Sequence, residues 1–172
     1  FTFYADADGD GYTTGATEVA CVAPTGYRLA SELVNTTDID CNYSDANVNP
    51  NPDCSVTSRI WTGHISTDWE EACNWSPNCV PSADDNVVIP NVTNAPVISG
   101  TTAALAKSVS VNGGSVLTIL SGGSLAINGS TGTALTLNGT VENHGAIEIG
   151  TSVGIGSTGI NSTGDFYNRT GA

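Results

Sequence analysis

Residues 108–127, S-V-S-V-N-G-G-S-V-L-T-I-L-S-G-G-S-L-A-I, decide the fold. They carry three apolar-x-apolar triplets separated by turns rich in Gly, Asn and Ser. Alternation with a period of two over three residues predicts very short strands that bury one face. The triplets of the chain are Val109-Ser-Val111, Leu117-Thr-Ile119, Leu125-Ala-Ile127, Leu135-Thr-Leu137, Ile147-Glu-Ile149 and Val153-Gly-Ile155.

Two all-β architectures compete for this region. The dipeptides Asn112-Gly113, Asn128-Gly129 and Asn138-Gly139 favour tight hairpins and therefore an antiparallel β-sandwich. Three-residue hairpins bury little area, however, whereas a parallel solenoid stacks the triplets into continuous apolar ladders. We therefore predict a parallel β-solenoid over 101–172, with one triplet per coil, unequal coils and insertions at the corners.

All three tryptophans, Trp61, Trp69 and Trp75, fall in the preceding segment, 56–100. We predict that they form a small core with Ile60, Ile65, Val80, Val87 and Ile89, because buried aromatic side chains supply most of the area a small cap can bury. The alternative is an exposed aromatic face that stacks on sugars. From Trp61 to Ile98 the sequence resembles the opening unit that precedes repetitive β-regions in large bacterial surface proteins, which implies a place outside the cell and no chemistry.

The first segment, 1–55, contains two acidic half-patterns, Asp6-x-Asp8-x-Asp10-Gly11 and Asp38-x-Asp40-x-Asn42 followed by Asp45. Side-chain oxygens at alternating positions, with a glycine at a sharp turn, are the ligands that Ca²⁺ requires. The loop is not an EF-hand, because its twelfth residue is Thr17 and no helical pattern flanks it. The second half-pattern is expected to supply the missing ligands.

Residues 3–52 resemble the thrombospondin type 3-like calcium repeats of secreted bacterial surface proteins. The resemblance lies in Y-x-D-x-D-G-D-G-Y (4–12), Cys21, P-T-G-Y (24–27), D-C-N (40–42) and Asp45. It implies a calcium site whose ligands are Asp6, Asp8, Asp10, Tyr12, Asp38, Asp40, Asn42 and Asp45.

Five cysteines without a C-x-x-C pair indicate a disulfide framework rather than a zinc site. We predict the pairs Cys21–Cys41 and Cys73–Cys79, each inside one segment, which leaves Cys54 over.

The formal net charge is −13, with most of the acid in 1–55, as expected of an exported protein. Only four side chains are cationic, which excludes a basic nucleic-acid surface, and no apolar run is long enough to insert into a membrane. The chain lacks Met and begins Phe-Thr-Phe, so we expect a mature or excised piece of a longer product.

The ladder has no recognisable cap after Ile160, so we expect an open end. Phe1, Phe3 and Tyr4 would form a free extended segment, with Phe1 and Phe3 on one face, that adds to the open end of a second copy. Such a head-to-tail contact is heterologous and predicts a homopolymer.

No catalytic motif surrounds His64 or His144, and we predict that the chain is not an enzyme. The predicted function is that of an extracellular structural protein, a calcium-stabilised subunit or segment of a surface filament or adhesin. The alternatives are a carbohydrate-binding module that uses the tryptophans and a polysaccharide-acting β-helix enzyme that pairs Glu142 with Glu148 or Asp165.

Overall fold

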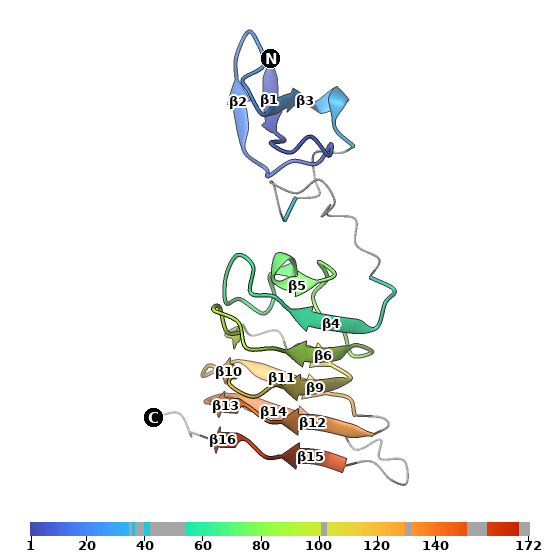
Figure 1. Cartoon of the computed structure of the whole chain (residues 1–172), viewed down its shortest axis with the longest axis vertical. Coiled ribbons are helices and arrows are strands. Elements are labelled where there is room, and N and C mark those ends of the chain that lie inside the picture. Colours follow the sequence, from blue (N-terminus) through green and yellow to red (C-terminus); the bar gives the residue numbers. More distant parts are fainter. Residues whose placement is uncertain are drawn as a thin grey trace. The chain divides into compact units, whose positions relative to one another are not determined.

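The computed structural model describes residues 1–34, 36, 40–41, 54–100, 103–129, 132–150 and 158–168. The chain divides into two compact units, unit 1 (Phe1–Pro52) and unit 2 (Asp53–Ala172) (Figure 1). This boundary lies close to the one predicted after residue 55. The second predicted boundary, between 56–100 and 101–172, does not separate compact units, because strands from both segments share one sheet.

Unit 1 contains a three-stranded antiparallel sheet in the order β2-β1-β3. The central strand β1 (Thr2–Ala5) pairs with β2 (Thr17–Val19) on one side and with β3 (Tyr27–Leu29) on the other, and a 3₁₀ turn, η1 (Ala30–Glu32), follows. Phe3 on β1 is buried. The aromatic start of the chain is therefore the core strand of this unit.

The prediction that residues 1–4 form a free extended segment is wrong. Both edges of β1 are hydrogen-bonded within unit 1, and the Ala20 N–H donates to the Phe1 carbonyl at 3.1 Å. The rings of Phe1 and Phe3 do lie on one face, with centroids 6.3 Å apart. This strand can reach another molecule only if the sheet of unit 1 opens.

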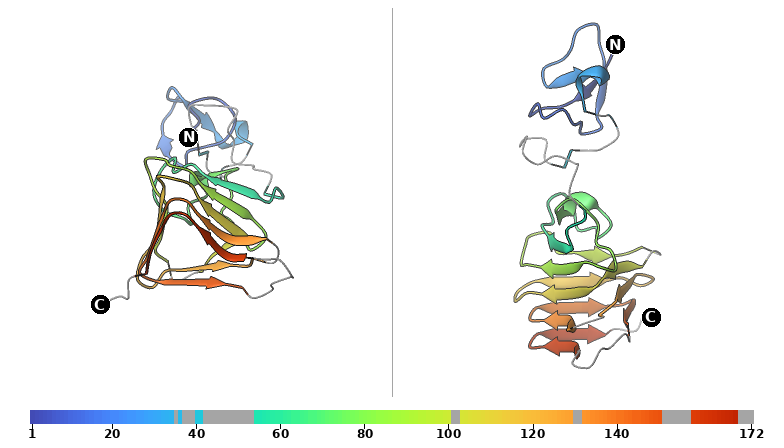
Figure 2. Two further views of the ribbon diagram at one scale, coloured as in Figure 1. Left: turned by 60° about the horizontal axis from the view of Figure 1, so that its bottom comes forward. Right: turned by 90° about the vertical axis from the view of Figure 1, so that its right-hand side faces the viewer.

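Unit 2 is a parallel β-solenoid in which three sheets surround one apolar core, as the end-on view in Figure 2 shows. Strands at the same place in successive coils pair in parallel. The predicted solenoid is confirmed, and the antiparallel sandwich is wrong. The coils are β6 (Asn86–Ile89), β7 (Val97–Ile98) and β8 (Ala104–Ala106); β9 (Ser108–Val111), β10 (Val116–Ile119) and β11 (Ser124–Ile127); β12 (Thr133–Leu137), β13 (Thr140–Asn143) and β14 (Ala146–Ile149); then β15 (Thr158–Ser162) and β16 (Asp165–Asn168).

A coil contains three strands, so the prediction of one coil per triplet is wrong. Each triplet stacks on the strand one full coil earlier, as Leu135 does on Val109 and Leu125 on Ala104. β13 was not predicted, because its inward residues, Val141 and Asn143, do not form an apolar pair. Asn143 is nevertheless buried, and its side-chain amide donates to Asn168 Oδ1 at 2.8 Å. The triplet at 153–155 lies outside the described residues.

Inward side chains form vertical ladders through the coils. One ladder runs Val87, Val109, Leu135 and Ile160, and another runs Ile89, Val111 and Leu137. Intervening side chains, such as Thr136, face outward. The stacked alternation is the physical origin of the period-two pattern in the sequence.

Corners of the coils bring backbone against backbone. A Cβ atom at Gly139 would collide with the carbonyl oxygen of Asn112, and one at Gly145 would collide with that of Gly123. The Asn-Gly dipeptides therefore make turns, as predicted, but all three turn corners between successive strands of the solenoid instead of closing hairpins. The corner that leads from the third sheet back to the first contains more residues in each successive coil. Between equivalent inward positions it runs from Ala104 to Val109, then from Leu125 to Leu135, and then from Ile147 to Ile160.

The tryptophans close the N-terminal end of the core. β4 (Ser58–Trp61) adds in parallel to β6, and β5 (Trp75–Ser76) pairs with β4 in the antiparallel sense. Trp61, Trp69 and Trp75 are at most 1% exposed, and Trp75 makes edge contacts with the other two rings at centroid distances of 4.9 and 4.7 Å. The predicted core with Val80, Val87 and Ile89 is confirmed. Ile60 and Ile65 are exposed, Ile60 because it faces outward between Arg59 and Trp61.

Arg59 occupies the inward position directly above Val87, where the ladder would otherwise end. Its side chain is buried and lies 3.5 Å from the buried carboxylate of Asp85, and Nη2 donates to the Cys54 carbonyl at 2.9 Å. Both Ser82 N–H and its hydroxyl donate to Asp85 Oδ2. Charge pairing and backbone carbonyls thus stabilise a cation placed on top of an apolar column, although Arg59 Nε is a buried atom without a hydrogen-bond partner among the described residues.

Both predicted disulfide pairings are wrong. Cys54 bonds to Cys79 with the Cα atoms 5.9 Å apart, and Cys21 is a free, exposed thiol. Cys41 and Cys73 are also disulfide-bonded. Sequence proximity suggested Cys73–Cys79, but Arg59 holds the carbonyl of Cys54 next to β4, and this chain path places Cys54 beside Cys79. Disulfides are typical of proteins that fold in an oxidising compartment.

We expect Leu135→Ala to destabilise unit 2 by about 2–5 kcal/mol, because it removes buried methyl groups from the middle of a ladder. The neighbouring outward substitution Thr136→Ala should change stability by about 0.5 kcal/mol or less. Urea unfolding followed by tryptophan fluorescence measures both. Equal effects of the two substitutions would contradict the inward and outward assignment.

Candidate metal centre

The acidic loop leaves the sheet of unit 1 at Asp6, directly after β1. Gly9 and Gly11 have φ angles of 81° and 90°, in the left-handed region that glycine adopts without strain. In this conformation the Gly9 N–H donates to Asp6 Oδ1 at 2.8 Å, and the Tyr12 N–H donates to Asp10 Oδ1 at 2.8 Å. The loop backbone therefore holds carboxylates from both its ends in fixed orientations.

Three of the predicted ligands converge. Asp6, Asp8 and Asp10 each offer one carboxylate oxygen, and these oxygens lie within 4.8 Å of one another. Asp6 is buried, and the other two residues are half-buried. In the described part of the chain, Asp8 Oδ2 and Asp10 Oδ2 are buried atoms without a hydrogen-bond partner. Such atoms are costly unless something binds them, and these two belong to neighbouring members of one cluster.

The crowding of negative charge affects Asp10 most clearly. Burial raises the pKa of the Asp10 carboxyl above its usual value; the hydrogen bond from Tyr12 lowers this pKa, and the charges of Asp8 and Asp6 raise it again. The folded loop therefore resists ionisation of Asp10 unless a cation is present.

One cation already contacts the cluster. Arg28 Nε lies 2.8 Å from Asp6 Oδ2, with the Arg28 side chain 45% exposed and that of Asp6 fully buried. A single positive charge leaves a cluster of three carboxylates with excess negative charge. No sequence motif marks Arg28 as a functional residue, although it is the sole Lys or Arg in 1–55 and so the natural counter-ion there.

The remaining predicted ligands are placed less completely. Tyr12 is buried beside the loop, and Asp40 comes close through its backbone, because its N–H donates to the Thr13 carbonyl at 2.9 Å. The carboxylate of Asp40 is buried but is not one of the three that converge. Asp38, Asn42 and Asp45 lie outside the described residues.

The donor set fits a hard divalent cation. Ca²⁺ accepts six to eight oxygen ligands, including carboxylates, and tolerates irregular geometry. Asp8 and Asp10 can offer their unpartnered oxygens and Asp6 a further lone pair, while such an ion supplies the positive charge that the cluster lacks. No sulfur or imidazole ligand belongs to the cluster, so the set is unlike that of a zinc site.

The alternative sites from the sequence analysis change in the structure. The tryptophans are buried, so the prediction of an exposed aromatic face for sugars is wrong. Glu142 lies on β13 and Glu148 on β14, in different sheets, and Asp165 lies on β16 two positions out of register with Glu142.

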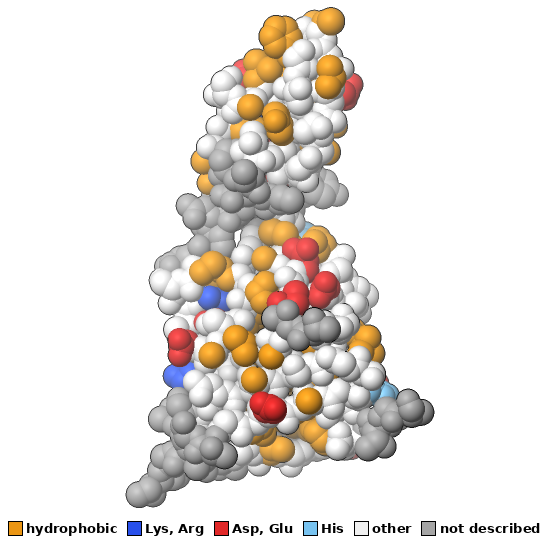
Figure 3. Space-filling model, turned by 180° about the vertical axis from the view of Figure 1, so that it is seen from behind, with side chains coloured by type: hydrophobic (Ala, Val, Ile, Leu, Met, Phe, Trp, Pro, Cys, Tyr) orange, Lys and Arg blue, Asp and Glu red, His pale blue; other side chains and the backbone are white. Residues whose placement is uncertain are grey.

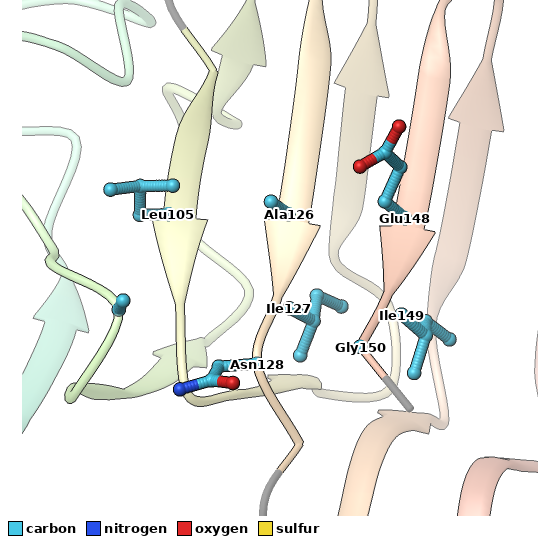
Figure 4. A pocket seen from close by; sticks show the side chains of 8 residues that line it. Leu105, Ala126, Ile127, Asn128, Glu148, Ile149 and Gly150 are labelled. Atoms are coloured by element: carbon cyan, nitrogen blue, oxygen red, sulfur yellow. The ribbon is translucent and has the colours of Figure 1, made fainter. Parts of the chain in front are cut away.

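A shallow groove crosses the outer face of the third sheet, where Leu105, Ala126 and Glu148 lie side by side on adjacent strands (Figure 4).

The surface gives little other chemical signal. On the face that Figure 3 shows, Lys and Arg side chains are few, and much of the surface is backbone and side chains that are neither charged nor hydrophobic. No helix in the described ranges has the length and apolar character needed to cross a bilayer.

The fold defines the class: this is a β-solenoid protein that also contains an acidic module. Unit 2 is a parallel coil of three sheets, and unit 1 has a loop in which three carboxylates converge. Residues 60–166 match the family described as Domain of unknown function (DUF8693), and the chain belongs to this family. The match spans the solenoid and the tryptophan cap, whereas the acidic loop precedes it. Comparison with curated proteins and with solved structures gave no significant match.

We expect Asp10→Asn to stabilise the metal-free form of unit 1 at neutral pH. Because the pKa of Asp10 is raised in the folded state, protonation favours folding: this stability is fully present below the unfolded-state pKa and is lost as the pH rises through the folded-state pKa. The protection factors of the β1 and β3 amides in excess chelator, with the intrinsic exchange rate at each pH divided out, should therefore rise in the wild type as the pH falls toward the ordinary carboxyl range, and Asp10→Asn should flatten this dependence.

The control is Glu18→Gln, which removes one exposed carboxylate from β2 of the same unit. It should leave the pH dependence as in the wild type. If Glu18→Gln and Asp10→Asn act alike, the effect comes from net charge and not from the cluster.

Proposed function

We propose that the chain is an extracellular structural protein, a calcium-stabilised subunit or segment of a surface filament or adhesin. The observation that carries the proposal is the convergence of Asp6, Asp8 and Asp10, with two buried oxygens unpartnered, on a unit next in sequence to a solenoid. Extracellular Ca²⁺ is abundant, so a modest site can stay loaded there. The disulfides agree with export.

Calcium would act on unit 1 as a substitute for a larger core. Among the described residues of unit 1, few side chains are buried and apolar, whereas unit 2 has a continuous apolar cluster. A bound cation would join the start of the loop to its later turn and remove repulsion among the carboxylates. The solenoid depends on apolar stacking, which Ca²⁺ does not affect.

A second part of the proposal concerns assembly. In the described part of the chain, β14, β15 and β16 are the outermost strands of the three sheets of unit 2, at the end of the solenoid opposite the tryptophans. Inward Ile160 is 49% exposed and Phe166 41%, whereas their ladder neighbours Leu135 and Val141 are 1% and 0% exposed. We propose that this coil accepts an edge of another copy. The donor cannot be residues 1–4 as predicted, because β1 is paired on both sides.

Calcium removal tests the first part. In excess chelator we expect limited proteolysis to cut first between residues 6 and 45, because the carboxylates repel one another, while unit 2 stays intact. Added Ca²⁺ should suppress these cuts in the wild type and fail to do so in the double variant Asp8→Asn, Asp10→Asn. Identical cleavage with and without Ca²⁺ would refute the calcium assignment.

Sedimentation velocity over a range of concentrations tests the assembly. We expect Ile160→Asp to abolish self-association, because it places a charge on the exposed inward ladder. Asn161→Asp is the matched control, since it adds the same charge to the adjacent, outward position of β15. Circular dichroism of both variants checks the fold. A wild type that is monomeric at all concentrations, or an Ile160→Asp variant that still assembles, would refute this part.

A further inference from the structure

Arg28 is the one cation that the structure places on the acidic loop, and nothing in the calcium proposal requires it. We infer that Arg28 is a built-in competitor of the metal: it holds Asp6 in the metal-free loop, is released when the metal binds, and thereby sets the affinity of the site. This inference rests on the proposed calcium function.

The position of Arg28 is fixed by the sheet and not by the loop. β3 pairs with β1 so that Arg28 stands opposite Tyr4, and the Asp6 N–H donates to the Gly26 carbonyl at 2.8 Å. Arg28 on β3 therefore lies next to the start of the acidic loop at Asp6. Its Nη2 lies 3.1 Å from where a Cβ of Gly9 would be, so the guanidinium rests against the loop backbone. A side chain at residue 9 would occupy that place.

The lone pairs of Asp6 show what Arg28 blocks. Each carboxylate oxygen offers about two acceptor sites. Asp6 Oδ1 accepts from the Gly9 N–H and keeps one site, whereas Oδ2 accepts from the Gly11 N–H at 3.3 Å and from Arg28 at 2.8 Å and is fully used. A cation can therefore reach Asp6 through Oδ1 while Arg28 stays, but it can use both oxygens only after Arg28 leaves.

Charge repulsion acts in the same direction. A guanidinium about 6 Å from a divalent cation, in a water-like dielectric, weakens binding roughly tenfold. The Arg28 side chain is already 45% exposed, and its release into water requires little rearrangement. In the metal-free state Arg28 is paired with Asp6. In the metal-bound state the guanidinium of Arg28 is released into solvent.

Calcium affinity of the full chain, measured by titration against a chromophoric chelator, tests the competition. We expect Arg28→Gln to bind Ca²⁺ about tenfold more tightly than the wild type, because both repulsion and blockade of Asp6 Oδ2 are gone. Arg28→Lys keeps the charge and should stay within about threefold of the wild type. The matched control is Lys107→Gln, which removes one positive charge from unit 2 and should leave the affinity unchanged.

A second measurement needs no variant. In the metal-free wild type the ¹⁵N–¹H signal of Arg28 Nε should be protected from exchange, and Ca²⁺ should abolish this protection as the pair with Asp6 breaks. Wild-type binding with an unchanged or weaker Arg28→Gln affinity, or an Arg28 Nε signal that keeps its protection while the loop amides shift, would overturn the inference alone. If the wild type and both Arg28 variants show no Ca²⁺ binding, the proposed function fails together with it.

Discussion

In-register parallel pairing is the constraint on which unit 2 depends. It sets each inward side chain directly beneath its counterpart in the previous coil, as Leu135 lies beneath Val109, so the core is continuous only if every coil is apolar at those positions. It also presses corner against corner, which restricts Gly139 and Gly145 to glycine. At the N-terminal end the ladder meets a buried arginine and a tryptophan cluster, and the apolar column is closed there by a charge pair and large rings.

Unit 1 is organised by electrostatic interactions instead of apolar stacking. Its sheet is small, and the loop after β1 gathers like charges around Asp6 instead of apolar groups. Backbone N–H groups and Arg28 offset part of the repulsion, yet Asp8 and Asp10 keep unpartnered oxygens. The two units therefore rest on different interactions: the solenoid on apolar burial, and the acidic loop on backbone hydrogen bonds and an ion pair.

Local patterns in the sequence predicted strands β9 to β12 and β14, the tryptophan core and the convergence of three aspartates, because each is a short-range regularity. The number of strands per coil was not predictable, because the sequence spacing between successive triplets does not show whether they lie in one coil or in successive coils. Cys54 was left unpaired because its proximity to Cys79 arises from a chain path fixed by Arg59. The prediction that residues 1–4 are free fails because no sequence pattern shows that β2 and β3 enclose them. For the same reason, no sequence pattern shows that Arg28 on β3 contacts Asp6.

The corner that leads from the third sheet back to the first lengthens from one coil to the next, although the ladders on both sides keep their register. The number of residues at this corner can thus vary while the core stays the same, although backbone contacts hold its start, where the Asn128 and Gly129 N–H groups donate to the Ala106 and Lys107 carbonyls. A foreign peptide inserted between Gly129 and Gly132 would keep these contacts and leave the stack undisturbed. Unit 2 thus combines a core of fixed register with an edge at which the length of the chain varies.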